Sequence, residues 1–508
     1  RKNQAGLHEA WSKSKRMTKK RLPLAIALTS IFIAAAVVLT WVFVPGILGN
    51  SQSPAPKPTE TTKPAPVVNE LDRIFDPSKV SQTFIELPQA SIKKLSSYNN
   101  EKYVAAKFRM IYDGTETQSV NVGIRIKGST THSTLNNLYY RPSFKIKFDW
   151  AKGYETQTLF GKRSLTFNAF VQDNSRLHET YAYKAYRAMD VPAPRTGYTT
   201  ITFEGETKPN KPSRGLYLVL ESEDEEFFAE HFQDVTQHVY ENNHDVTDFD
   251  KAKIGGDVET STYFKVKQGW KATPNRDDLR AFTTAVNTSG KTFWDNLAVV
   301  ADRERLIMLF AVDNFTGNWD TYSGPLRNNF TFRSNLEGKF TFVPWGTDQS
   351  FGENLFNDPG ARVRFPGYRL PVKTHDDFFI TVDKPWTGYP GSYVFAYSAG
   401  LRDMAKMENY QILRGKIFAK CLRYAPCATL YFQNLQKLST WAKTEKLSDQ
   451  MRGTGKLIDQ YLTEYQKVEA TRTANWTDKQ IVRVDAAIKR NCTLDTNGLV
   501  TTCKAANG

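Results

Sequence analysis

Residues 22–44 form an apolar run without a charged side chain, and this run limits what the rest of the chain can fold into. About 20 consecutive apolar residues are enough to cross a bilayer as one helix. The preceding residues 1–21 are strongly basic, with Glu9 as their only acid. Because positively charged flanks stay in the cytoplasm, we predict a cytoplasmic tail at 1–21, a transmembrane helix at 22–44 and an extracytoplasmic remainder.

A cleaved signal peptide is the alternative interpretation of the same run, and it also exports the rest of the chain. The apolar core is longer than the usual signal-peptide core of about 7–15 residues. A retained anchor is therefore favoured, and the chain is predicted to be a single-pass protein of the cell membrane.

Residues 45–69 separate this run from the remainder of the chain. They are rich in Pro, Thr and Ser and cannot build a core, which predicts an extended linker. Residues 70–508 are ample for a two-lobed domain. Strand patterns dominate their first part and helical patterns their last, so we predict an α+β domain with a strand-rich N-lobe (about 70–222) and a mainly helical C-lobe (about 223–508).

All four cysteines lie late in the chain, as two close pairs. Cys421 with Cys427, and Cys492 with Cys503, predict two local disulfides, although four cysteines allow three connectivities. A zinc site is the alternative, but no histidine lies near either pair. Disulfides agree with export into an oxidising compartment.

Candidate site residues are concentrated between positions 313 and 352. An apolar stripe with helical spacing at 302–314 runs into Gly317, so Asp320 is predicted in the loop after a helix. The following segments alternate apolar and polar residues around a turn, which predicts a β-hairpin. Asn328 or Asn329 opens its first strand, and Asp348 follows its second.

Phosphoryl transfer needs a carboxylate that orients the attacking hydroxyl and oxygen ligands for Mg²⁺ on the nucleotide phosphates. Two aspartates and an asparagine on adjacent elements meet this need, although such a triplet also arises by chance in loops. A hydrolase that uses a pair among Asp313, Asp320 and Asp348 is an open alternative. It leaves the asparagines without a role.

The same stretch and three upstream segments resemble the CotH family of atypical secreted kinases. The matching segments are GIRIKGSTTHSTLNNLYYRPSFKIKF (123–148), DNSRLHETYAYKAYRAMDVPAPRTGYTTITFEG (173–205), GLYLVLESEDEEFF (215–228), NWD (318–320) and GKFTFVPWGTD (338–348). The sequence departs from the family pattern at Gly346, where the family has its first Asp after the Pro-Trp pair. The later Asp348 is retained.

This resemblance implies an atypical protein-kinase-like, two-lobed fold. It implies transfer of the γ-phosphate of ATP, with Mg²⁺, to Ser or Thr hydroxyls of exported or cell-surface proteins. Asp320 would orient the hydroxyl, and Asp348 with Asn328 or Asn329 would hold the metal.

Lysines upstream gain a phosphate-binding role from the resemblance. Lys145 and Lys147 alternate with apolar residues on a predicted strand, and Lys145 is our choice for the phosphates. The alternative is a solvated strand face. Gly128 opens a Ser/Thr-rich turn whose N–H groups could cover phosphates, and a plain hairpin turn is the alternative there.

A helix predicted over 175–189 carries two further candidates. Glu179, in its first turn, would pair with the phosphate-binding lysine, although the helix macrodipole also favours an acid there. Arg176 is a second candidate for phosphate contact. The strand ending at Glu221 and the acidic residues after it suit a hinge between the lobes.

The formal net charge is +15, and residues 1–21 contribute about half of it. No basic helix or aromatic–basic repeat stands out, so nucleic-acid binding is not predicted. A hypothesis of another class is an exported adhesin or structural module that keeps the fold and uses its surface. The retained Asp320 and Asp348 favour the enzyme, whereas Gly346 and the Gly128 loop leave the module open as the alternative.

Overall fold

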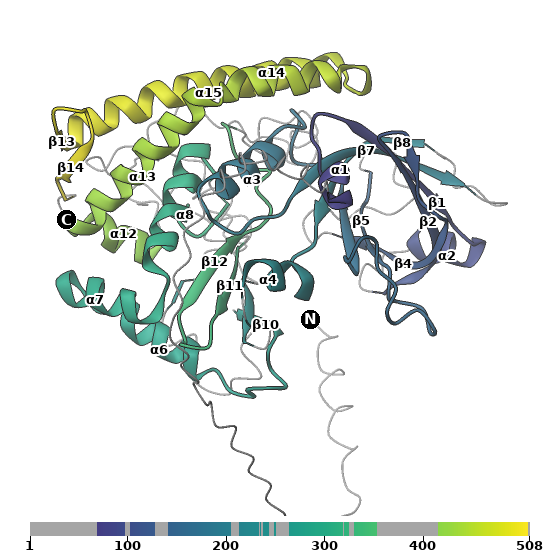
Figure 1. Cartoon of the computed structure of the whole chain (residues 1–508), viewed down its shortest axis with the longest axis horizontal. Helices are drawn as coiled ribbons and strands as arrows, with labels where there is room; N and C mark the ends of the chain where they lie inside the picture. The colour runs from purple at the N-terminus through teal and green to yellow at the C-terminus, as the bar shows by residue number, and fades with distance from the viewer. Residues whose placement is uncertain are drawn as a thin grey trace, which may run out of the picture. The chain divides into compact units, whose positions relative to one another are not determined.

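A computed structural model gives the architecture of the chain (Figure 1). It divides the chain into Arg1–Pro66 and Val67–Gly508, and the helices and strands of the described residues all belong to the second unit. The described residues are 69–96, 102–127, 141–204, 213–232, 234, 237–242, 248–249, 264–318, 320–324, 330–352 and 415–505.

The first half of this unit is built around one sheet of eight strands, in the order β1-β7-β8-β6-β5-β4-β2-β3. Since β1 also pairs with β2, seven of these strands form a closed ring, with β3 attached to β2. The elements are α1 (Glu70–Ile74), β1 (Val80–Glu86), α2 (Gln89–Leu95), β2 (Val104–Tyr112), β3 (Thr115–Glu116), β4 (Val120–Lys127), β5 (Ser143–Lys147), β6 (Ser164–Asn168), α3 (His178–Ala188), β7 (Thr196–Glu204) and β8 (Ser213–Glu221).

Closure of the sheet depends on β1. Phe84 lies opposite Arg109 in antiparallel β2 and opposite Thr202 in parallel β7. Apolar residues that alternate along the strands fill the interior, among them Ile124, Ile126, Phe144, Ile146 and Phe148, all at most 3% exposed. The expected alternation of Lys145 and Lys147 with apolar residues on a strand is confirmed.

The closed sheet corrects the predicted fold class. The chain combines helices and strands, but its first half is a closed seven-stranded sheet and not the N-lobe of a kinase-like, two-lobed domain. The prediction failed because alternation shows that a segment is a strand and does not show which distant strand it pairs with. Here the deciding partners, β1 and β7, lie more than a hundred residues apart.

Helices and a second, four-stranded sheet in the order β10-β9-β11-β12 make up the rest of the unit. Its elements are α4 (Glu225–His231), β9 (Val239–Asn242), β10 (Phe264–Gln268), α6 (Asp277–Val286), α7 (Gly290–Val300), α8 (Arg303–Thr316), β11 (Phe330–Ser334), β12 (Phe340–Pro344), α12 (Lys416–Leu422), α13 (Ala425–Thr444), α14 (Leu447–Leu457), the 3₁₀ helix η3 (Asp459–Tyr461), α15 (Glu464–Asn491), β13 (Cys492–Leu494) and β14 (Val500–Cys503). Helix α8 and the β11–β12 hairpin confirm two predicted elements.

Strand β8 joins the two halves because its side chains alternate between two cores. Tyr217 and Val219 face the interior of the closed sheet. Leu218 and Leu220 belong to a larger core that also takes in α3, α8 and the C-terminal helices. The outer face of the closed sheet is therefore covered by the second half at β8.

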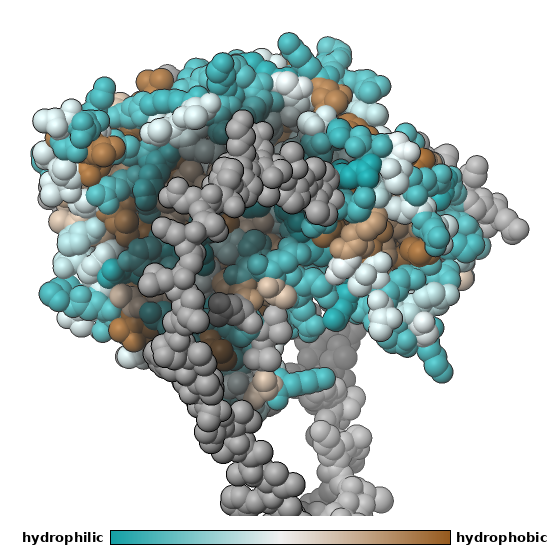
Figure 2. All heavy atoms as spheres, viewed as in Figure 1, coloured by the Kyte–Doolittle hydropathy of each residue, from teal (hydrophilic) through white to brown (hydrophobic). Residues whose placement is uncertain are grey.

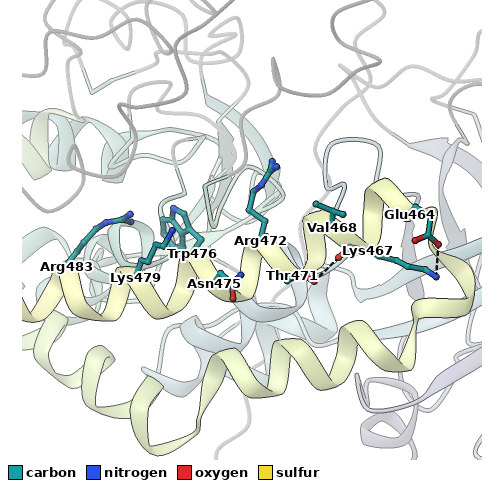
Figure 3. Close-up of a pocket in the computed structure, with 9 residues that line it drawn as sticks. All are labelled: Glu464, Lys467, Val468, Thr471, Arg472, Asn475, Trp476, Lys479 and Arg483. Carbon is teal, nitrogen blue, oxygen red and sulfur yellow. Dashed lines mark hydrogen bonds and ion pairs between the residues drawn. The ribbon is translucent and has the colours of Figure 1, made fainter.

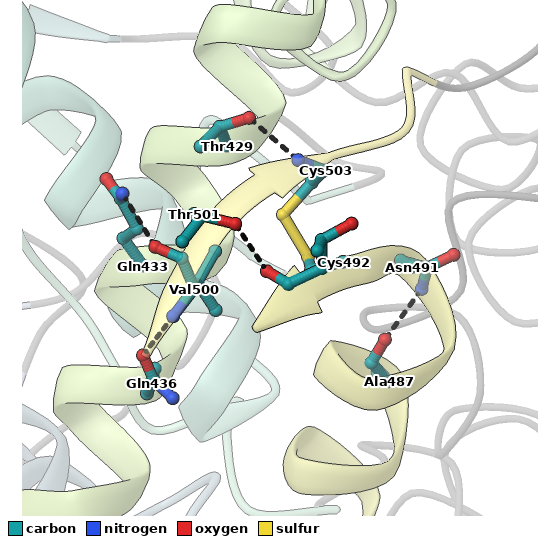
Figure 4. Close-up of a disulfide and its surroundings, with 10 residues drawn as sticks. Thr429, Gln433, Gln436, Ala487, Asn491, Cys492, Val500, Thr501 and Cys503 are labelled. Carbon is teal, nitrogen blue, oxygen red and sulfur yellow. Dashed lines mark hydrogen bonds between the residues drawn. A yellow bond between two sulfur atoms is a disulfide. The ribbon is translucent and has the colours of Figure 1, made fainter. Parts of the chain in front are cut away.

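Both predicted disulfides are present, Cys421–Cys427 and Cys492–Cys503. The second joins β13 to β14 (Figure 4). This small hairpin is also bound to α13, because Gln433 donates to the Val500 carbonyl at 3.1 Å and the Val500 N–H donates to Gln436 at 3.0 Å.

The predicted membrane anchor is corrected as well. Among the described residues, no helix is long and apolar enough to cross a bilayer. The run at 22–44 on which the prediction rested, the tail at 1–21 and the linker up to residue 68 lie outside those residues. No helix of the described residues therefore supports the predicted single-pass anchoring.

Candidate active site

Asp320 lies in the short loop after α8, as predicted. The helix ends at Gly317, which adopts a left-handed conformation with φ of 65°. The chain then turns back, because the Asn318 N–H donates to the Asp313 carbonyl at 2.8 Å. The Asn318 side chain accepts from the Asp320 N–H at 3.2 Å, and Asp320 is 9% exposed. The loop thus fixes the backbone of Asp320.

Asp313 holds this loop from the last turn of α8. Its carboxylate accepts hydrogen bonds from Tyr186 on α3 and, at 2.8 Å and 3.4 Å, from Ser323 and Thr321 in the loop. Asp313 is fully buried, and burial raises its pKa to about 7. Its oxygens are occupied by hydroxyls, so Asp313 positions the loop rather than meeting a ligand.

Asp348 follows β12 in a loop that α3 holds at two points. The Gly346 N–H donates to the Tyr183 hydroxyl at 3.0 Å, and His178 Nδ1 lies 2.9 Å from the Asp348 carbonyl oxygen. Gly346 has φ of 59°, a left-handed conformation that glycine adopts readily. The departure from the family pattern at this position thus coincides with a backbone turn that favours glycine.

Glu179 on α3 is connected to a lysine of the closed sheet through Asn168. Asn168 Nδ2 donates to both Glu179 oxygens at 2.8 Å, and Asn168 Oδ1 accepts from Lys127 Nζ at 2.8 Å. Lys127 also lies over the Trp345 ring, 4.9 Å from its centroid. Lys127, Asn168 and Glu179 therefore form a chain of hydrogen bonds next to the Asp348 loop, and we call this chain the Lys127–Asn168–Glu179 relay.

Several carboxyl groups lie close enough to Asp348 to act on its charge. Burial, followed by repulsion from Glu179, Asp320 and Asp173, holds the pKa of Asp348 well above its usual range. Burial raises the pKa of Glu179 to about 7. It also lowers the pKa of Lys127, against the attraction of Glu179 and Asp348.

Such a cluster suits a divalent cation, because a cation would relieve the repulsion between Asp348 and Asp320. In the part of the chain that the structure describes, no three His, Cys, Asp or Glu residues are arranged to bind a metal. Mg²⁺ commonly takes only one or two protein carboxylates and completes its shell with phosphates and water. Asp348 and Asp320 fit that donor set.

The predicted phosphate-binding lysines lie elsewhere on the same face of the sheet. Burial lowers the pKa of Lys145 to about 8, and the acid that acts on it most strongly is Asp224. Lys147 is 41% exposed and pairs with Asp149 at 3.6 Å. The structure thus places Lys127 with Glu179, whereas the sequence motifs did not single out Lys127. Its position at the end of an alternating strand was the available signal.

Arg176 is held inside the loop before α3. Its guanidinium donates to the carbonyls of Phe170 and Asp173, and Asp173 caps α3 by accepting from the His178 N–H at 2.9 Å. The other sequence candidates, Gly128, Asn328 and Asn329, lie outside the described residues.

The fold and the site define a class of protein: a mixed domain in which a half-buried lysine and asparagine are linked to a buried glutamate, beside two interacting aspartates. Residues 124–376 match the family described as CotH kinase protein. Inner spore coat protein H of Bacillus subtilis (strain 168) is 24% identical over 237 residues, covering 45% of this chain and 60% of that relative. The chain therefore contains a domain of the CotH family, as its motifs predicted.

Proposed function

We propose that this protein is a kinase that transfers the γ-phosphate of ATP to Ser or Thr hydroxyls of a protein substrate. The observation that carries the proposal is the Lys127–Asn168–Glu179 relay beside Asp348 and Asp320. Kinases use a lysine–glutamate pair to place the phosphates and carboxylates to hold Mg²⁺ and orient the hydroxyl. The family match to CotH kinase protein supports the same activity.

Each residue has a defined role in this proposal. Lys127, oriented by Asn168 and Glu179, neutralises charge on the nucleotide phosphates. Asp348 and Asp320 would hold Mg²⁺, which would supply charge neutralisation for the nucleotide phosphates. Asp320 also accepts the proton of the substrate hydroxyl as its oxygen bonds to the γ-phosphorus, while the bond between that phosphorus and the β–γ bridging oxygen breaks to release ADP.

Nucleotide binding is tested by thermal denaturation of the full chain with and without ATP and Mg²⁺. We expect a higher melting temperature with both ligands, because a ligand that binds only the folded state stabilises it. Asp348→Ala and Lys127→Met should each abolish the increase. Lys147→Met is the matched control, since Lys147 lies on a neighbouring strand but is 41% exposed, and it should keep the increase.

Transfer is tested by incorporation of radiolabelled phosphate from ATP into a Ser/Thr-containing acceptor protein. Asp320→Ala should lose labelling while its circular dichroism spectrum stays that of the wild type. Equal labelling by Asp320→Ala would contradict its role. The absence of any ligand-dependent stabilisation in the wild type would favour a non-catalytic adhesin or structural module instead.

A further inference from the structure

Helix α15 carries a groove of about 510 Å³ on one face (Figure 3). Arg472, Trp476 and Arg483 point to the same side of the helix in this view. The lining residues recur every three or four positions, which places them along one stripe of the helix. They are Glu464, Lys467, Val468, Thr471, Arg472, Asn475, Trp476, Lys479 and Arg483.

The groove is basic, with four cationic side chains and one acid. Lys467 pairs with Asp459 and Glu464 at 3.0 Å each, and Arg472 pairs with Glu469 at 2.8 Å. Lys479 has no ion-pair partner among the described residues. The two Lys467 pairs are largely exposed and contribute little to stability, so an anionic ligand can displace them. The Arg472 side chain is 64% exposed and stays accessible to a ligand, although the Glu469 carboxylate that it pairs with is buried. The upper edge of Figure 2, where α14 and α15 lie, is mostly hydrophilic.

Trp476 connects the groove to both loops of the candidate active site. A Cβ atom on Gly317, three residues before Asp320, would lie 2.9 Å from the Trp476 ring. One on Gly352, four residues after Asp348, would lie 2.5 Å from it. The indole therefore packs directly against the backbone that flanks the two aspartates, and one side of the groove adjoins the site.

Further contacts attach α15 to the same elements. Thr473 Oγ1 lies 3.1 Å from Nε2 of His178, whose other ring nitrogen contacts the Asp348 carbonyl. Gln480 donates to the Asn314 carbonyl at 3.1 Å in the last turn of α8. The groove thus has a fixed position relative to the candidate active site.

We propose that this groove binds a phosphorylated segment of the protein substrate, an inference that rests on the proposed kinase function. Two of its four cations are arginines, whose planar guanidinium groups bind phosphate in a bidentate manner. From Lys467 to Arg483 the stripe extends about 24 Å along the helix, the length of about seven residues of extended peptide. A phosphate added at the adjoining site would thus be retained while the next hydroxyl is presented.

The test is the fluorescence anisotropy of a labelled peptide with several phosphoserines, titrated with the full chain without ATP. Arg472→Glu combined with Lys479→Glu should weaken binding at least about tenfold, because two attractive charges become repulsive. Lys489→Glu combined with Arg490→Glu is the matched control. It makes the same charge change on exposed residues of α15 outside the groove and should change affinity less than about twofold.

Three results would overturn the proposal. They are equal binding of the unphosphorylated peptide, equal binding of a peptide with Asp at the phosphoserine positions, and equal weakening by the control pair. Asp320→Ala separates this proposal from the kinase proposal. It should lose phosphate transfer and keep phosphopeptide binding, so each proposal can fail without the other.

Discussion

Asp313 is the residue on which the Asp320 loop depends. Replacing it with Ala removes the acceptor for three hydroxyl groups, from Tyr186, Thr321 and Ser323. Because buried hydroxyls without partners are costly, we expect Asp313→Ala to lower the free energy of unfolding by about 2–4 kcal/mol. Asp313→Asn keeps an acceptor and should cost about half as much. Urea denaturation measures both, and an Ala variant as stable as the wild type would contradict the role.

Glu179 makes stability depend on pH. Its folded-state pKa is about 7, above the ordinary value of 4.5, so the folded protein holds this proton more tightly than the unfolded chain does. This contribution to stability is complete below pH 4.5 and is lost as the pH rises through 7. The free energy of unfolding should therefore fall across that window.

Glu179→Gln tests the contribution of Glu179 to this pH dependence, because glutamine does not titrate. The free energy of unfolding of the variant should fall less steeply with pH. Asp313 titrates in the same direction with a pKa of about 7, so part of the slope remains. Chemical denaturation at a series of pH values measures the slopes. Parallel slopes in the two proteins would show that Glu179 is not the group responsible.

At the scale of elements, the contact between the Asp348 loop and α15 depends on the absence of a side chain at Gly352. This residue has φ of 81°, and a Cβ atom there would lie 2.5 Å from the Trp476 ring. Gly352→Ala should lower the free energy of unfolding by about 2–4 kcal/mol, from backbone strain and from displacement of the indole.

Gly498, in the β13–β14 hairpin, is the matched control for Gly352. Its φ is 77°, and no atom lies within 4 Å of the position that a Cβ atom would take there. Gly498→Ala should therefore show only the backbone cost, about 1 kcal/mol. Thermal denaturation compares the two variants, and equal losses would mean that the Trp476 contact is unimportant.

Several elements followed from the sequence because their signals are local. The periodicity before Gly317 predicted α8, alternation around a turn predicted the β11–β12 hairpin, and both disulfides were predicted from close cysteine pairs. The start of α3 was less accurate. It begins at His178 and not at 175, because Arg176 has φ of 66° and Asp173 caps the helix.

At the scale of the molecule, the two cores share β8 and should unfold together. Tyr217 and Val219 pack in one core, and Leu218 and Leu220 in the other, so losing either core exposes the strand. We expect a single unfolding transition in urea, with circular dichroism and tryptophan fluorescence giving the same midpoint. Two separate transitions would indicate independent lobes.

The sequence by itself determined the local elements, the family and the positions of Asp320 and Asp348 in loops, and it favoured the two local disulfides that the structure then showed. These features depend on neighbouring residues or on motifs that remain together along the chain. Only the tertiary structure decided that the sheet closes through β1 and that Lys127, not Lys145, joins Glu179. The reason is physical: both outcomes depend on pairing between distant strands, which brings side chains together independently of their separation in sequence.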